Sequence, residues 1–116
     1  MFKVIVAGGR DFLDYNLLEQ KLDKLLINKS DVRIISGMAK GADKLGETYA
    51  SIRKLGVEVY PAEWEKFGKS AGYKRNEVMA DHAEALVAFW DGKSRGTKHM
   101  IDIAKAKGLA LRVIIY

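Results

Sequence analysis

The sequence predicts an α/β fold, a Rossmann-like three-layer α/β/α sandwich around a mostly parallel five-stranded sheet. Five short segments rich in β-branched and aromatic residues alternate with four helical ones, and most are apolar nearly throughout, as strands covered on both faces are. Strands that alternate with helices of this length pair in parallel through right-handed crossovers, so helices are expected on both faces. The 116 residues are 48% hydrophobic, which predicts one domain over residues 1–116.

The elements follow one another at regular intervals. Strands are expected at Lys3–Ala7, Val32–Ser36, Val57–Tyr60, Ala85–Trp90 and Leu109–Ile115. Between them, apolar residues recur at helical spacing in three stripes. The stripes are Leu17, Leu18, Leu22, Leu25 and Leu26; Leu45, Tyr49 and Ile52; and Thr97, Ile101 and Ala104. Gly56 and Gly108 each lie just before a strand and are expected to end the preceding helix.

The interval between the third and fourth strands is less regular. A weaker helix is expected over residues 73–83, with Val78, Met79 and His82 on its inner face. The twelve residues Pro61–Gly72 before it show no clear period. Because an irregular segment of this length in a small domain is usually a binding loop or a lid, we expect it to cover a ligand.

Composition excludes several kinds of site. The chain has no cysteine and only two histidines, His82 and His99, so no metal centre, disulfide or cysteine nucleophile is predicted. The apolar runs of four to six residues are too short to span a bilayer. The N-terminal run MFKVIVAGG ends in glycines rather than a cleavage site and indicates a first strand. We therefore expect a cytoplasmic protein with no membrane partner.

The net charge of +5 is only mildly concentrated in the loops that follow the strands. Such a bias helps an anionic ligand to arrive. No dense run of Lys and Arg marks a stripe that would bind duplex nucleic acid.

The placement of the glycines predicts where a ligand binds. Eight of the eleven follow the ends of the first four strands, and these are Gly8, Gly9, Gly37, Gly41, Gly68, Gly72, Gly92 and Gly96. Open α/β sheets bind ligands at this edge, where glycines allow close approach and helix N-termini attract phosphate. The segments GGRDF and GKSRGTK fit neither a dinucleotide fingerprint nor a Walker A loop, which disfavours Walker-type ATP hydrolysis. We expect a nucleotide-type ligand with a phosphate, and no certain cofactor.

Charged and aromatic residues supply the rest of the predicted site. Arg10 and Arg75 suit bidentate phosphate recognition, although Arg10 could instead pair with a nearby aspartate, Asp11 or Asp14. Asp43 and Asp91 are candidates for ribose binding or proton transfer, against the simpler roles of complementing a helix dipole and starting a turn. Together with Arg75, they are the weak catalytic candidates.

Hydroxyl and aromatic side chains have similar alternatives. Ser36, Ser94 and Thr97 are expected to donate hydrogen bonds to phosphate or to cap helices. Trp64 is the better candidate for stacking on a base, and Tyr73 a weaker one, whereas Trp90 is expected in the core and His99 in a structural role. The predicted ligand-binding residues are Gly8, Gly9, Arg10, Ser36, Gly37, Gly41, Ala42, Asp43, Trp64, Arg75, Asn76, Asp91, Gly92, Ser94, Gly96 and Thr97.

Five motifs in this order resemble a known family. They are GGRDF (8–12), SGMAKGAD (36–43), AEW (62–64), GKSAGYKRNEVM (68–79) and AFWDGKSRGT (88–97). Together they resemble the YspA/YpsA-related branch of the SLOG superfamily, which groups the DprA (Smf) DNA-processing proteins with the LOG phosphoribohydrolases. The resemblance implies a Rossmann-like fold with a nucleotide or nucleotide-derived ligand at the C-terminal ends of the strands.

Two members of the superfamily suggest different functions. Gly37, Ala39, Gly41 and Asp43 resemble the G-x-A-x-G-x-D element of DprA. Residues 75–97 resemble the LOG segment that carries an arginine and a G-T pair, but His99 and Met100 stand where LOG enzymes place a catalytic glutamate. Three hypotheses therefore stay open: a nucleotide-binding protein such as a sensor, a LOG-like phosphoribohydrolase, and a DprA-like binder of single-stranded DNA. The LOG resemblance also makes a homodimer conceivable.

Overall fold

The computed structural model describes residues 1–116. Its strands are β1 (Phe2–Gly8), β2 (Val32–Ser36), β3 (Gly56–Val59), β4 (Ala85–Trp90) and β5 (Ala110–Ile115). Its α-helices are α1 (Tyr15–Leu26), α2 (Ala42–Arg53), α3 (Trp64–Phe67), α4 (Ala71–Asp81) and α5 (Arg95–Ala106), and a 3-10 turn, η1, spans Gly68–Ser70.

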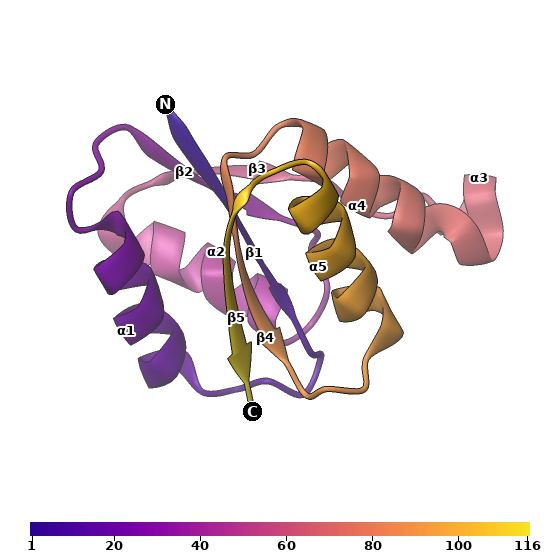
Figure 1. The fold of residues 1–116 in the computed structure, drawn as a ribbon, viewed down its shortest axis with the longest axis horizontal. Helices are drawn as coiled ribbons and strands as arrows, with labels where there is room; N and C mark the ends of the chain where they lie inside the picture. Colours follow the sequence, from indigo (N-terminus) through magenta and orange to yellow (C-terminus); the bar gives the residue numbers. More distant parts are fainter.

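All five strands are parallel and lie in the order β3-β2-β1-β4-β5. The chain moves outward from β1 in one direction and then returns to add β4 and β5 on the other side. Helices α1 and α2 therefore cover one face of the sheet, and α4 and α5 cover the other (Figure 1). The α/β prediction is confirmed, and the sheet is wholly rather than mostly parallel.

The core has two layers that meet at the central strands. Val4 and Val6 of β1 pack toward α1 and α2, whereas Ile5 and Ala7 pack toward α4 and α5. The first layer includes Leu18, Leu22, Ile34, Tyr49 and Val87, and the second includes Ile35, Met79, Leu86, Met100 and Ala104. Burial on both faces explains why β1, β2 and β4 are almost continuously apolar. It does not extend to the edge strands β3 and β5, which are largely exposed despite their apolar composition.

Two expectations about helix α2 are wrong. Ile52 is 58% exposed, because Gly46 instead occupies the inner face and lets the helix approach Val6 closely. The end of α2 is formed by Lys54 in the left-handed conformation, and Gly56 already belongs to β3. At the end of α5, by contrast, Gly108 has a φ of 75°, as expected for a helix-terminating glycine.

The segment Pro61–Gly72 contains more helical structure than predicted. It contains α3 and η1, and α4 begins at Ala71, two residues before the expected start. The inner face of α4 is also rotated, because Asn76 and Ala80 are buried beside Met79 while Val78 and His82 lie at the surface. Figure 1 shows α3 at the far end of α4, away from the sheet.

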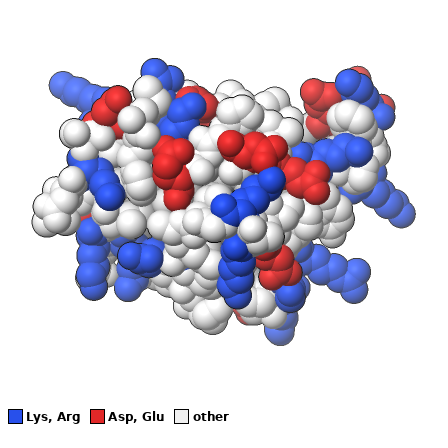
Figure 2. All heavy atoms as spheres, turned by 45° about the horizontal axis from the view of Figure 1, so that its top comes forward, with Lys and Arg blue, Asp and Glu red and all other residues white.

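The surface carries charges of both signs. Figure 2 shows Lys and Arg side chains interspersed with Asp and Glu on the face that it presents, with no continuous basic stripe there. None of the helices is both long and apolar enough to cross a membrane.

Candidate functional site

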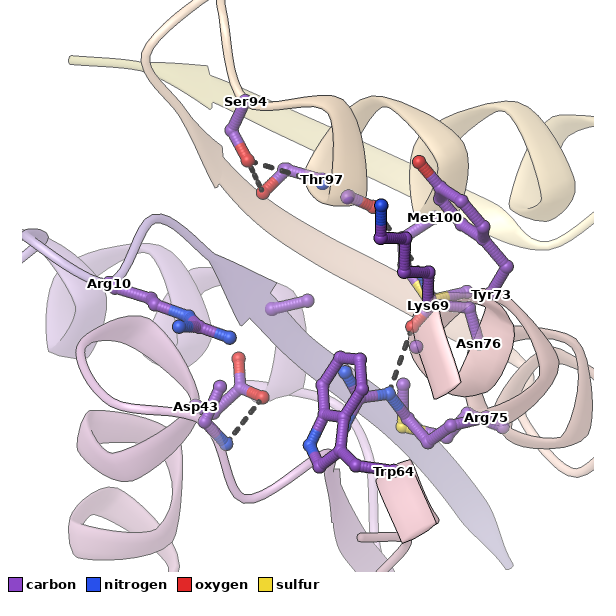
Figure 3. Close-up of a pocket in the computed structure, with 15 residues that line it drawn as sticks. Arg10, Asp43, Trp64, Lys69, Tyr73, Arg75, Asn76, Ser94, Thr97 and Met100 are labelled. Atoms are coloured by element: carbon purple, nitrogen blue, oxygen red, sulfur yellow. Dashed lines mark hydrogen bonds between the residues drawn. The ribbon is translucent and has the colours of Figure 1, made fainter. Parts of the chain in front are cut away.

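A cavity of about 240 Å³ opens where the strand order reverses, beside the C-terminal ends of β1 and β4. Its fifteen lining residues are Ala7, Arg10, Ala39, Asp43, Trp64, Lys69, Gly72, Tyr73, Arg75, Asn76, Met79, Ser94, Gly96, Thr97 and Met100. They come from β1, the loops that follow β1, β2 and β4, helices α2 to α5 and the 3-10 turn η1 (Figure 3). In open α/β sheets, this switch point is the usual position of a ligand. We call this cavity the inner lobe.

Asp43 is the one acidic residue of the inner lobe. It lies in the first turn of α2, is only 5% exposed, and its Oδ2 accepts a hydrogen bond of 3.2 Å from the Ala39 amide. Burial raises the pKa of Asp43 from 3.8 to about 6, although the Ala39 amide and the charge of Arg75 offset part of this effect. A carboxyl group with this pKa exchanges its proton close to neutral pH.

Arg75 of α4 connects three parts of the site. Its Nη1 donates to the carbonyl oxygens of Gly37 at 2.6 Å and Tyr60 at 3.4 Å, and its Nε donates to Asn76 Oδ1 at 3.1 Å. A Cβ atom on Gly37 would lie only 2.6 Å from this Nη1, so a side chain at position 37 would displace the guanidinium. A larger residue at position 37 would therefore disturb the hydrogen bonds that Arg75 makes.

Arg10 lies on a hydrogen-bonded turn, and its side chain has no partner. The Gly9 carbonyl accepts hydrogen bonds from the amides of Phe12 and Ala42, and the Gly9 amide donates to Phe89 O. The Arg10 guanidinium donates no hydrogen bond and joins no ion pair. The alternative of a salt bridge to a nearby aspartate is therefore wrong.

Both of those aspartates have other partners. Asp14 accepts a hydrogen bond from the Leu17 amide and caps α1, and Asp11 accepts one from the Tyr116 hydroxyl. Arg10 and Arg75 are near enough for their charges to repel, since Arg10 contributes, after burial, to lowering the pKa of Arg75. An anion between the two guanidinium groups would relieve this repulsion.

Tyr116 fixes the turn that presents Arg10. Its ring packs edge-on against Phe12 at 4.9 Å between centroids, and its hydroxyl donates to Asp11. Tyr116→Phe should destabilise the protein by about 1 kcal/mol, because the turn that carries Arg10 loses the hydrogen bond between Tyr116 and Asp11. Amide exchange at Phe12, measured by NMR, should become faster.

Tyr60→Phe is the matched control, because it also removes a phenol-to-carboxylate hydrogen bond, to Glu58, but leaves the turn intact. Equal amide exchange at Phe12 in wild type and Tyr116→Phe would refute this positioning role.

The loop before α5 is shaped by its own side chains. Asp91 Oδ1 accepts hydrogen bonds of 2.8 Å from the amides of Lys93 and Ser94, and the amide of Ser94, followed by that of Lys93, lowers the pKa of Asp91. Ser94 caps α5 by accepting from the Thr97 amide at 3.5 Å, and Trp90 Nε1 donates to Ser94 O at 3.0 Å. Asp91 therefore starts a turn, which is the simpler of its two predicted roles. It does not line the inner lobe.

Aromatic and amide side chains close the other end of the cavity. Trp64 of α3 is 52% exposed and points into the middle of the site in Figure 3. Asn76 Nδ2 lies 3.2 Å from His99 Nδ1; since an amide NH2 group only donates, His99 accepts and is held neutral. Burial also lowers the pKa of His99, and its ring packs against Tyr73 at 4.4 Å. These contacts support a structural role for His99.

Comparison with known proteins identifies the family of this chain. The family model described as the YspA, cpYpsA-related SLOG family matches residues 2–67, more than half of the chain. The chain belongs to this SLOG family. The SLOG resemblance predicted from the five motifs is thereby confirmed.

Relatives of this SLOG chain occur in phages and prophages. It is 33% identical over 116 residues to the Gene 61 protein of Mycobacterium phage D29, in a match that covers 94% of this chain and 93% of that protein. It is 40% identical over 52 residues to the uncharacterized SPbeta prophage-derived protein YoqJ of Bacillus subtilis (strain 168). That second match covers 42% of this chain and 30% of YoqJ.

Among solved structures, the SLOG chain is similar to DNA processing protein A (DprA) from Streptococcus pneumoniae, with a TM-score of 0.73. The match covers 97% of this chain but only 50% of DprA, so the chain spans half the length of that protein. At 19% identity, the likeness concerns the fold.

The SLOG structure brings together half of the predicted ligand-binding residues. Those that line the inner lobe are Arg10, Asp43, Trp64, Arg75, Asn76, Ser94, Gly96 and Thr97. Gly37 lines an adjoining cavity that shares residues with it. The remaining predicted residues line neither cavity, and these are Gly8, Gly9, Ser36, Gly41, Ala42, Asp91 and Gly92. Ser36, for example, is fully buried and its hydroxyl donates to Glu47 Oε2 at 2.6 Å.

Six lining residues stand outside the predicted ligand-binding set, namely Ala7, Ala39, Lys69, Gly72, Met79 and Met100, although Lys69 and Gly72 belong to the Pro61–Gly72 segment that was expected to cover a ligand. Lys69 could have been found as a cation beside glycines in GKSAGYKR. Met79 and Met100 gave no such signal, because methionines at helical spacing look like core residues. No group of three or more His, Cys, Asp or Glu residues lies close enough to hold a metal ion.

Proposed function

We propose that the inner lobe binds a nucleotide through its phosphate, which lies between Arg10, Arg75 and the N-terminus of α5. The observation that carries the proposal is the unpaired guanidinium of Arg10, carried on a hydrogen-bonded turn near a second guanidinium. Lys69 adds a third positive charge, and only Asp43 opposes them. The free planar fork of Arg10, the Nη2 of Arg75 that its structural hydrogen bonds leave over, and a helix N-terminus form a strong site for a phosphate group.

The rest of the lobe suits a nucleoside. Trp64 and Tyr73 offer aromatic surfaces to a base, while Met79 and Met100 supply an apolar wall. Ser94 and Thr97 hydroxyls and the carboxyl group of Asp43 offer partners for ribose hydroxyls. A nucleotide would therefore use each kind of side chain in the lobe.

AMP is a suitable probe for this proposal. Calorimetric titration should show AMP binding at least about tenfold more tightly than adenosine, because the phosphate makes charge-assisted hydrogen bonds to both arginines. Arg10→Gln should weaken AMP binding about tenfold for the same reason.

Arg112→Gln is the matched control, since Arg112 lies on the edge strand β5 and donates to the neighbouring Leu111 carbonyl. Binding of adenosine as tight as that of AMP, or an Arg10→Gln protein that binds AMP like wild type, would contradict the proposed phosphate site.

Cleavage of a nucleoside monophosphate is a second candidate function, and Asp43 favours it. Water would attack the ribose C1′ as the bond to the base breaks; Asp43 would donate a proton to the leaving base and recover one from the water. A carboxyl pKa of about 6 suits this exchange. Met100, which stands where LOG enzymes place a catalytic glutamate, lines the lobe but offers no carboxylate. Asp43 is therefore the only acid in the lobe that could carry out this step.

The assay for this candidate is the release of free adenine from AMP, with Asp43→Asn as the inactive control. AMP recovered intact after prolonged incubation with wild-type protein would contradict this second candidate.

A further inference from the structure

A second cavity of about 510 Å³ adjoins the inner lobe, and we call it the outer lobe. It is lined by Arg10, Gly37, Met38, Ala39, Lys40, Pro61, Ala62, Trp64 and Arg75. Arg10, Ala39, Trp64 and Arg75 line both lobes. The two cavities are therefore parts of one site, with both guanidinium groups and the Trp64 indole at their junction.

The outer lobe has its own chemistry. Its charged residues are Arg10, Lys40 and Arg75, and it contains no acid. Its uncharged walls are the side chains of Met38, Pro61 and Ala62, together with the exposed indole of Trp64. Cations beside apolar and aromatic surface form the same combination that makes the inner lobe suitable for a nucleotide.

A single nucleotide would leave one lobe empty. The inner lobe, at about 240 Å³, lies below the usual range of ligand pockets, which is roughly 300–1,000 Å³. A phosphate held by Arg10 and Arg75 would lie at the junction, so a ligand with a nucleoside on each side of its phosphates would reach both lobes. The Lys40 ammonium group would then donate hydrogen bonds to the ribose or the base of the second nucleotide unit.

We propose that the outer lobe takes a second nucleotide unit of the same ligand, so that the complete site recognises a molecule of two linked nucleotides. This inference rests on the proposed function, since both lobes share the phosphate site of Arg10 and Arg75. The shared chemistry occurs in free dinucleotides and in single-stranded nucleic acid.

The test compares AMP, diadenosine diphosphate, in which a pyrophosphate links two adenosines, and a ten-nucleotide deoxyadenosine strand. Diadenosine diphosphate should bind at least about tenfold more tightly than AMP in calorimetry at matched ionic strength, because it fills both lobes. A strand that binds more tightly than diadenosine diphosphate identifies nucleic acid as the source of the two units, and a weaker one identifies the free dinucleotide.

Lys40→Gln tests the outer lobe independently, because Lys40 lines the outer lobe and not the inner one. It should weaken diadenosine diphosphate binding about threefold to tenfold and AMP binding less than about twofold. The matched control is Lys44→Gln, because Lys44 lies on α2, pairs with Glu47 at 3.7 Å and lines neither lobe. Equal affinity for AMP and diadenosine diphosphate, or equal effects of Lys40→Gln on both, would overturn the second lobe alone. Absence of binding by AMP and by every longer ligand would overturn the proposed function and the second lobe together.

Discussion

Arg75→Ala is expected to abolish nucleotide binding and to lower the free energy of unfolding by about 2–3 kcal/mol. The guanidinium donates to Gly37 O, Tyr60 O and Asn76 Oδ1, and truncation would leave two backbone carbonyls without this partner. The same substitution removes one of the two guanidinium charges beside the proposed phosphate, together with the Nη2 donor that the protein does not use. Urea denaturation measures the stability, and calorimetry with AMP measures the binding.

Arg75→Lys distinguishes charge from geometry. Lysine keeps the positive charge but cannot reach Gly37 O, Tyr60 O and Asn76 Oδ1 at once, because it lacks the planar fork. We expect Arg75→Lys to recover little of the stability and to bind AMP at least about tenfold more weakly than wild type. If Arg75→Ala unfolds like wild type and still binds AMP, Arg75 is neither the connector of the site nor its phosphate ligand.

Asp43→Asn is expected to stabilise the protein near neutral pH by about 2–3 kcal/mol, an unusual direction for a change at a buried position. Burial raises the pKa of Asp43 from 3.8 to about 6, so the charged form is the less favourable one in the native state. Each unit of pKa shift corresponds to about 1.4 kcal/mol. Asparagine keeps an oxygen that can accept from the Ala39 amide but carries no charge.

The pH dependence follows from the sign of this shift. Between about pH 4 and pH 6, the native state retains the Asp43 proton while the unfolded chain has lost it. The stabilisation of the native state by protonated Asp43 is therefore fully present below this pH range. It is lost as the pH rises from about 4 to about 6 and is absent at higher pH. The difference between Asp43→Asn and wild type should be largest above pH 6 and disappear toward pH 4.

Asp102→Asn is a control of opposite sign. Lys98, which donates to Asp102 at 2.8 Å, lowers the pKa of that exposed carboxylate. Its replacement should slightly destabilise the protein above the window rather than stabilise it. Urea denaturation at pH 4, 6 and 8 measures both variants, and an Asp43→Asn protein less stable than wild type at pH 8 would contradict the account. A stabilising substitution at a ligand site indicates that the carboxylate is kept for function.

The fold could be predicted because the central strands carry a strong signal. Ala85–Trp90 and Val32–Ser36 were expected with the bounds that the structure shows, since both strands are buried by helices on each side. The edge strands β3 and β5 and helix α4 were displaced by one or two residues. There, exposed valines and small inner residues weaken the link between hydrophobicity and burial.

The candidate site was predictable as an edge of the sheet but not as a cavity. Glycines after the strands, with Arg10, indicated the edge at which the inner lobe opens, and Arg10, Asp43 and Arg75 line that lobe. Whether a loop residue faces the ligand or the loop itself depends on local hydrogen bonds. Asp91 and Ser36 use their side chains to hold their own loops, and no spacing in the sequence distinguishes this use from ligand binding.

An NMR titration of the isotope-labelled protein with AMP tests the central claim most directly. We expect chemical-shift changes to concentrate on the turn carrying Arg10, the amides around Asp43, the Trp64 indole N–H, the Arg75 side chain and the first turn of α5. Changes confined to α1, none of whose residues lines either lobe, or a spectrum unaltered at millimolar AMP, would contradict it.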